Sequence, residues 1–179
     1  MIEQLDQVFR FTLRNILLWS GWVLPMFFAV SLMGGDEAQA AEKIVVGEVE
    51  DVILLPWGVK LPARIDTGAS LSSLDARDLK VRDGFAEFNL SKKYGGMHLR
   101  LPIVDWLTIR SSEASEKRPI VEVEVCIGSR RVHLRVNLND RSTVRYPLLI
   151  GRNALKEYFL VDCMQERCSP PSCPEVSPK

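Results

Sequence analysis

A tight turn at the end of an apolar run is the feature that most constrains how this chain folds. The β-branched and apolar run Val59–Ile65 leads directly into Asp66-Thr67-Gly68-Ala69. An Asp in such a turn lies among backbone N–H donors, and two such loops placed face to face form a pair of carboxylates that shares one proton and activates water. Asp-Thr-Gly is also a favourable turn sequence in any protein. The tripeptide alone therefore leaves two interpretations open, a catalytic loop and an ordinary turn.

A second motif lies far downstream, where an apolar run opens a short helical pattern. It reads Leu148-Leu149-Ile150-Gly151-Arg152-Asn153. The two motifs, in this order, resemble those of the retropepsin-like aspartic peptidases, which carry Asp-Thr-Gly-Ala early and two apolar residues followed by Gly-Arg-Asn or Gly-Arg-Asp late. The resemblance covers residues 43–162. It favours the catalytic interpretation of the first turn.

Two longer patterns narrow the resemblance to one bacterial branch. Residues 66–74 read D-T-G-A-x-x-S-S-L, and residues 140–152 read D-R-x-x-x-x-Y-P-L-L-I-G-R. Both are similar to the RimB-like proteins, which are often labelled ATP-dependent zinc proteases. The sequence supports neither part of that label, because it has no H-E-x-x-H, its two histidines (His98 and His133) are far apart, and no phosphate-binding loop is present. We therefore expect no metal and no cofactor. Ser72 and its neighbours also lack the G-x-S-x-G pattern of serine hydrolases.

The rest of the pattern is rich in short β-strands. Pro56-Trp57-Gly58 predicts a hairpin between two apolar runs, and Lys92–Gly96 predicts a loop. Apolar or alternating runs predict strands over residues 45–55, 59–65, 85–90, 99–104, 120–125 and 131–136. The clearest helical pattern is residues 153–158. We predict an all-β fold, a small closed β-barrel with one short C-terminal helix, and the resemblance implies the same retropepsin-like barrel.

The resemblance also implies how the site is built. Each retropepsin-like chain contributes one Asp, so a homodimer would place Asp66 and its symmetry mate at the two-fold axis. Thr67 would make the crossed hydroxyl hydrogen bonds between the loops, and Gly68 would allow their close backbone approach. The residues expected to support the loop structurally are Ala69, Gly151, Arg152 and Asn153.

Two departures from the retroviral pattern concern the parts around the catalytic turn. Many retroviral members have an Asp after D-T-G-A that pairs with the late Arg, whereas this chain has Ser70. The partner of Arg152 is therefore open between Asp75, Asp78 and a backbone carbonyl. The expected flap tip, Ile109–Ser115, is polar and lacks Gly, and residues 85–104 form an insertion. An ordinary apolar peptide is a poor match for such a flap.

The candidate substrate-binding residues are Arg110, Ser111 and Arg141, which flank the flap tip or the late motif. Arg is suited to bidentate binding of carboxylates, although most exposed Arg side chains are simply solvated. RimB-like proteins are associated with ATP-grasp glutamate ligases, so the resemblance implies an acidic or glutamyl-containing peptide substrate. The function expected is that of an aspartic endopeptidase. The alternative is a non-catalytic retropepsin-fold module that binds a peptide or a partner protein.

The N-terminal segment predicts export. Arg10 and Arg14 precede an apolar run over residues 16–33, and Ala38-Gln39-Ala40 follows it. A basic, then apolar, then A-x-A order is typical of a secretory signal peptide. The run is also close to the minimum length for a membrane-spanning helix, so an uncleaved anchor is the alternative. We expect residues 1–41 to be a signal peptide or membrane anchor, and the protein to be periplasmic.

Composition bears on the partners and on the end of the chain. The 23 Lys and Arg residues balance 23 Asp and Glu residues, which disfavours nucleic-acid binding. Residues 42–162 are long enough for one domain with its own core. Three of the four cysteines lie in the tail 163–179, which we expect to be disordered or stapled by a disulfide rather than bound to a metal. Cys126 lies in a strand-like run and fits a small buried residue.

Overall fold

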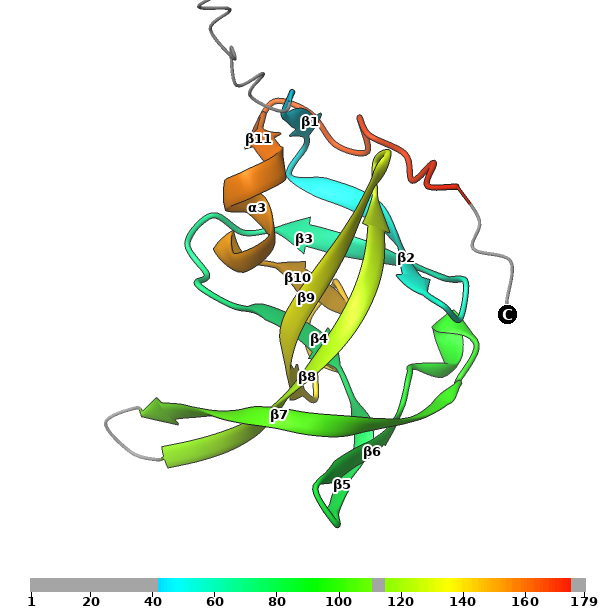
Figure 1. The fold of residues 1–179 in the computed structure, drawn as a ribbon, viewed down its shortest axis with the longest axis vertical. Helices are drawn as coiled ribbons and strands as arrows, with labels where there is room; N and C mark the ends of the chain where they lie inside the picture. The colour runs from blue at the N-terminus through cyan, green and yellow to red at the C-terminus, as the bar shows by residue number, and fades with distance from the viewer. Residues whose placement is uncertain (1–41, 111–114, 175–179) are drawn as a thin grey trace, which may run out of the picture. The chain divides into compact units, whose positions relative to one another are not determined.

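The computed structural model describes residues 42–110 and 115–174, and these form a closed β-barrel (Figure 1). Neighbouring strands pair around the ring until the first meets the last, because β2 pairs with both β3 and β8. In ring order the strands are β2 (Val49–Leu55), β3 (Val59–Ile65), β10 (Leu148–Ile150), β4 (Ser72–Asp75), β9 (Arg130–Asn139) and β8 (Ser115–Ile127). The predicted small closed barrel is confirmed, and so is its short helix, α3 (Arg152–Tyr158).

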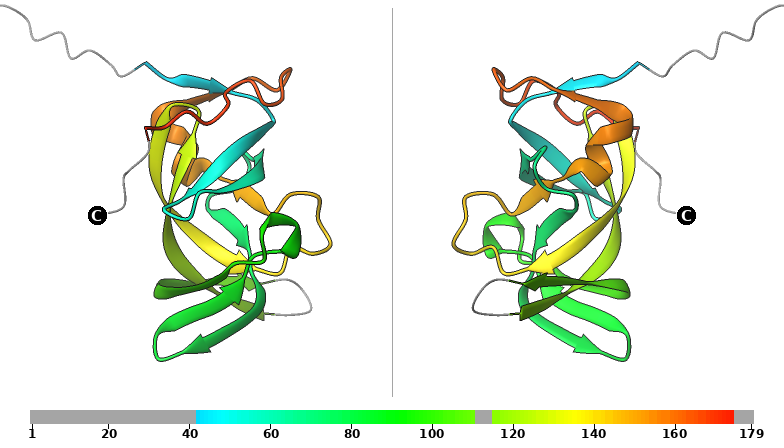
Figure 2. Two further views of the ribbon diagram at one scale, coloured as in Figure 1. Left: turned by 90° about the vertical axis from the view of Figure 1, so that its right-hand side faces the viewer. Right: turned by 90° about the vertical axis from the view of Figure 1, so that its left-hand side faces the viewer.

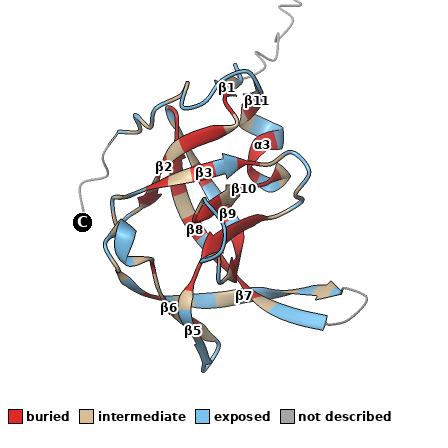
Figure 3. Cartoon of the chain, turned by 180° about the vertical axis from the view of Figure 1, so that it is seen from behind, coloured by how far each residue is buried: buried red, intermediate tan, exposed pale blue. Residues whose placement is uncertain are grey.

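The barrel interior is filled by the alternating apolar residues of its strands. In β8 and β9 the register places Val121 opposite Val136 and Val123 opposite Leu134, and all four are buried. Figure 3 shows the buried residues concentrated on the barrel strands, whereas β5 and the outer part of the β7–β8 hairpin are mostly exposed. The strict alternation that predicted a strand with one buried face therefore also fixes which residues form the core.

Three further strands extend the sheet beyond β8. They are β7 (His98–Arg110), β6 (Phe85–Asn89) and β5 (Arg77–Arg82), with a one-turn 3-10 helix, η2 (Lys92–Tyr94), between β6 and β7. The expected insertion, residues 85–104, therefore consists of β6, η2 and the first part of β7. The expected flap is the hairpin of β7 and β8, which projects past the barrel (Figures 1 and 2). Residues 111–114 of its tip, including Ser111, lie outside the described residues.

The ends of the described chain meet on one side of the barrel. β1 (Ile44–Val46) pairs in parallel with β11 (Phe159–Val161). The tail then runs beside β1 and β2, where Glu48 N–H donates to the Gln165 carbonyl at 2.8 Å. A disulfide joins Cys126 to Cys173, so the interpretation of Cys126 as only a small buried residue is wrong.

The predicted signal peptide or anchor, residues 1–41, lies outside the described residues. Within the part that the structure describes, no helix is long and apolar enough to cross a membrane.

Candidate active site

The Asp66 carboxylate lies in a loop that surrounds it with backbone donors. β3 ends at Ile65, and the N–H of Asp66 donates to the Ile150 carbonyl of β10 at 2.9 Å. One carboxylate oxygen, Oδ1, accepts hydrogen bonds from the N–H groups of Gly68 (2.9 Å) and Ala69 (3.1 Å). A Cβ at Gly68 would lie 3.2 Å from that oxygen, so a larger residue would crowd the carboxylate. Asp66 is half-buried, which leaves the carboxylate partly open to solvent.

Arg152 holds the Asp66 loop from behind through backbone carbonyls. Its Nη1 donates to the carbonyl oxygens of Thr67 (2.8 Å) and Gly68 (2.6 Å), and its own N–H donates to the Ala69 carbonyl at 2.9 Å. Of the three partners left open by the sequence, the backbone carbonyl is the one found. Asp78 binds the side-chain amide of Asn89 instead, and Asp75 belongs to another network.

A buried hydrogen-bond triangle connects the two sequence motifs. Oδ1 of Asn153 accepts from both the N–H (2.9 Å) and the hydroxyl (2.8 Å) of Ser72, and the Ser72 hydroxyl in turn accepts from the Gly151 N–H at 3.0 Å. A Cβ at Gly151 would lie 2.8 Å from the backbone carbon of Leu71, so this close approach requires glycine. Asn153 also donates to the Arg135 carbonyl at 2.8 Å. Sequence reasoning considered Ser72 only as a nucleophile and missed this role, although the D-T-G-A-x-x-S-S-L pattern contains the residue.

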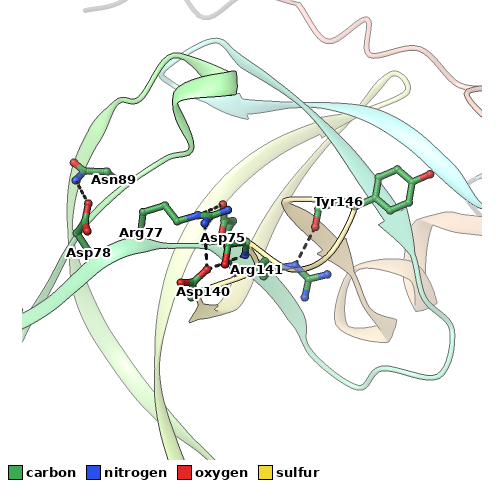
Figure 4. A network of polar contacts seen from close by, with 8 residues as sticks. Asp75, Arg77, Asp78, Asn89, Asp140, Arg141 and Tyr146 are labelled. Carbon is green, nitrogen blue, oxygen red and sulfur yellow. Dashed lines mark hydrogen bonds and ion pairs between the residues drawn. The ribbon is translucent and has the colours of Figure 1, made fainter.

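A second polar network fixes the loop that leads into β10. Asp75 is 2% exposed, and its two oxygens accept from Arg77 Nε and from the Arg141 N–H, each at 2.7 Å. Arg77 also lies 3.3 Å from Asp140. The Arg141 side chain bends the other way and donates to the Tyr146 carbonyl at 3.1 Å (Figure 4). Each oxygen of Asp75 therefore accepts a hydrogen bond, and the bond from the Arg141 N–H anchors loop 140–147 to β4.

The Arg141 guanidinium lies within electrostatic reach of Asp66. Burial has the largest effect on Arg141 and lowers its pKa. The negative charges of Asp75 and Asp66 raise this pKa, and the positive charge of Arg118 lowers it. Each of these charges therefore lies within electrostatic reach of Arg141. Arg118 binds Glu116 through Nη2 at 2.7 Å, while its buried Nε has no hydrogen-bond partner within the described residues. Arg141 thus brings positive charge to the surroundings of Asp66, and Arg118 interacts with Arg141.

The other predicted residues lie at the edges of this site. Thr67 is exposed at the turn of the loop, and Arg110 is exposed at the end of β7, opposite Ser115. His98 lies beside Asn89 and His133 beside Glu122. Within residues 42–110 and 115–174, no group of three or more His, Cys, Asp or Glu side chains is arranged to hold a metal.

Residues 45–172 match the model of a family described as RimB-like, retropepsin-like aspartic endopeptidase RimB. The chain belongs to the RimB-like family. Its fold is also similar to the crystal structure of Lpg0085, a protein with unknown function (DUF785) from Legionella pneumophila. That match has a TM-score of 0.62 at 26% identity and covers 72% of this chain and 99% of that chain.

Two curated relatives are each named "Probable alpha-L-glutamate ligase". They come from Shewanella pealeana, at 29% identity, and Shewanella halifaxensis, at 27%, each over 136 residues and 70% of this chain. The aligned part makes up 30% of the length of each relative. Most of each relative therefore lies outside the part that this chain resembles.

Proposed function

We propose that this protein is an aspartic endopeptidase whose catalytic pair is Asp66 of one chain and Asp66 of a second copy. The observation that carries the proposal is the Asp66 loop itself. Its carboxylate accepts two backbone hydrogen bonds, and the loop is held from behind by Arg152 and the Ser72–Asn153 contact. Membership of a family of aspartic endopeptidases supports the same function.

The chemistry requires two carboxylates because one group cannot act as acid and base in the same step. Two close carboxylates do not both ionise, so one stays protonated. The charged carboxylate takes a proton from water while the water oxygen bonds to the scissile carbonyl carbon, and the protonated one donates to the carbonyl oxygen. In the collapse of the tetrahedral intermediate, the carboxyl group that took the proton from water gives it to the amine nitrogen, and the C–N bond breaks. The other carboxylate takes a proton from a hydroxyl of the intermediate, which becomes the product acid, and the pair returns to its starting state.

An exposed apolar pair supports contact with a second copy. Val45 of β1 and Leu160 of β11 are register partners, and they are 43% and 54% exposed. Exposed neighbouring apolar side chains favour a contact surface. Leu160→Asp is therefore expected to shift the protein toward monomer in analytical ultracentrifugation and to lower hydrolysis with it.

The substrate that we propose is an acidic or glutamyl-containing peptide. Arg141 brings positive charge within electrostatic reach of Asp66, and the buried Nε of Arg118, which in turn interacts with Arg141, is a donor suited to an oxygen ligand. The relatives named as glutamate ligases contain a segment like this chain, which is consistent with a reaction that makes glutamyl peptides acting before this one.

We place the activity in the periplasm. The Cys126–Cys173 disulfide supports this, because such bonds persist mainly in oxidising compartments. Cell fractionation with a C-terminal tag is the test, and a wholly cytosolic protein would refute the placement.

The experiment for the central proposal compares Asp66→Asn with the wild type on a glutamate-rich peptide library, read by mass spectrometry. Asp66→Asn should keep its solution mass and lose hydrolysis. Glu122→Gln is the matched control, since Glu122 is an exposed carboxylate of β8 beside His133. Equal cleavage by Asp66→Asn and wild type would refute the proposal. Peptide binding without cleavage by the wild type would favour the non-catalytic module instead.

A further inference from the structure

A polar cleft lies between loop 140–147 and the η2 turn, which Figure 2 shows side by side. Its volume is about 200 Å³. The charged residues that line it are four cations, Arg77, Lys93, Arg141 and Arg145, and one carboxylate, Asp75. The cleft therefore has an excess of positive charge.

Among the described residues that line the cleft, the only carboxylate is that of Asp75, and it already accepts hydrogen bonds from other residues. Both oxygens of Asp75 accept hydrogen bonds, one from the Arg77 side chain and one from the Arg141 backbone. Arg77 is also the cation that contacts Asp140 (Figure 4). The negative charge of Asp75 therefore compensates the positive charge of Arg77. Lys93, Arg141 and Arg145 remain, and none of them forms an ion pair within the described residues.

These three cations are held in place without counter-ions. The Arg141 Nε donates to the Tyr146 carbonyl. The Arg145 guanidinium lies 5.2 Å from the centre of the Tyr146 ring, and the Lys93 ammonium lies 5.5 Å from that of Tyr94. Aromatic faces attract cations at this range. A cleft in which one sign of charge is in excess concentrates an electric field, and an excess of positive charge attracts anions.

The strand β10 connects the cleft to the candidate active site. Pro147 lines the cleft and directly precedes this three-residue strand, and Ile150 at the other end of the strand accepts the hydrogen bond from the Asp66 N–H at 2.9 Å. A second hollow of about 510 Å³ shares Arg77 and Ser91 with the cleft, and its lining also contains Lys92 and Asp78. A peptide that is bound at Asp66 and continues alongside β10 toward loop 140–147 would reach the cleft.

We propose that this cleft is a secondary subsite that binds the carboxylate side chain of an acidic substrate residue away from the scissile bond, with Lys93 and Arg145 as the residues that recognise it. The inference rests on the proposed function, because it requires a peptide that extends from Asp66. The cleft is smaller than the roughly 300–1,000 Å³ of pockets for drug-sized ligands, which suits a single side chain. The Arg fork matches a carboxylate in geometry as well as charge.

The test uses two fluorogenic peptides that share the residues around the scissile bond and differ only in an extension, which contains Glu in one and Gln in the other. The readout is the ratio of kcat/KM for the Glu peptide to kcat/KM for the Gln peptide. In the full-length double variant Lys93→Gln/Arg145→Gln this ratio should fall about tenfold relative to wild type. Arg130→Gln is the matched control, since Arg130 also lies over a Tyr ring, 5.0 Å from that of Tyr158, but does not line the cleft. It should leave the ratio at its wild-type value.

A ratio that is unchanged in the double variant, or that falls equally in Arg130→Gln, would overturn the inference while leaving the peptidase proposal in place. Binding of the Glu peptide to Asp66→Asn, measured by fluorescence anisotropy, tests the subsite independently of the proposed peptidase reaction. If the wild type cleaves no peptide but Lys93 and Arg145 still govern this binding, the subsite stands and the proposed reaction fails. Binding of inorganic phosphate without binding of the Glu peptide would overturn the subsite as an acidic-peptide site.

Discussion

The Ser72 hydroxyl is the group whose removal tests the architecture of the candidate site most sharply. It is fully buried, accepts from the Gly151 N–H at 3.0 Å and donates to Asn153 Oδ1 at 2.8 Å. Ser72→Ala keeps the backbone hydrogen bond to Asn153 but leaves the Gly151 N–H without its acceptor. A buried donor that loses its partner costs about 1–3 kcal/mol, so we expect the free energy of unfolding to fall by about that amount.

Urea denaturation measures this loss, with an unchanged m-value as the sign that the unfolded state is the same. Ser70→Ala is the matched control, because Ser70 is exposed in the same loop, and it should change stability by less than about 0.5 kcal/mol. Adding Asn153→Ala completes a double-mutant cycle, for which we expect a coupling energy of about 0.5–3 kcal/mol between Ser72 and Asn153.

Two results would refute this reasoning. Equal stability losses in Ser72→Ala and Ser70→Ala would mean that the buried hydroxyl contributes nothing beyond an exposed one. Strictly additive effects of Ser72→Ala and Asn153→Ala would mean that the contact between the two motifs is not energetically coupled.

Three further predictions concern the rest of the domain. Gly151→Ala would place a Cβ 2.8 Å from backbone, so a loss of about 1–3 kcal/mol is expected in the same denaturation assay, and wild-type stability would contradict the close approach. Cys173→Ser should lower stability by about 2–4 kcal/mol under oxidising conditions and by nothing under reducing ones, while exposed Cys163→Ser should change neither. The Trp106 N–H bond lowers the pKa of Asp105 in the folded state, so the stability that Asp105 contributes is present above its unfolded pKa and lost as the pH falls through the folded one. Thermal melts in acid should accordingly show a smaller pH dependence for Asp105→Asn than for wild type.

The strands over the predicted runs follow from local apolar and alternating patterns, whereas β4, β5, β10 and β11 lie outside those runs. Residues 120–125 alternate strictly, and β8 buries Val121, Val123 and Val125. The single strand predicted over residues 45–55 is wrong, because the structure divides this run into β1 and β2, with Gly47 and Glu48 between them. Closure of the barrel depends on pairing between β2 and β8, which are far apart in sequence. No local pattern contains that information.

The sequence predicts only the part of the candidate site that is formed by residues adjacent in the chain. The motif residues are adjacent in sequence, so the Asp66 turn and the Gly151-Arg152-Asn153 segment could be recognised. The partners of Arg152 are set by how the loop lies against α3, and backbone carbonyls carry no sequence signal. The use of Asp75 by loop 140–147 likewise depends on tertiary packing that the sequence does not show.

Mixed dimers test most directly whether two copies of Asp66 form one catalytic pair. Wild-type and Asp66→Asn chains are refolded together at a constant total concentration, and hydrolysis is measured against the wild-type fraction. If both carboxylates are needed, only dimers of two wild-type chains are active, so activity should follow the square of that fraction and fall to about a quarter in an equal mixture. A linear decline, with about half the activity in the equal mixture, would show that each Asp66 acts alone and would contradict the shared pair.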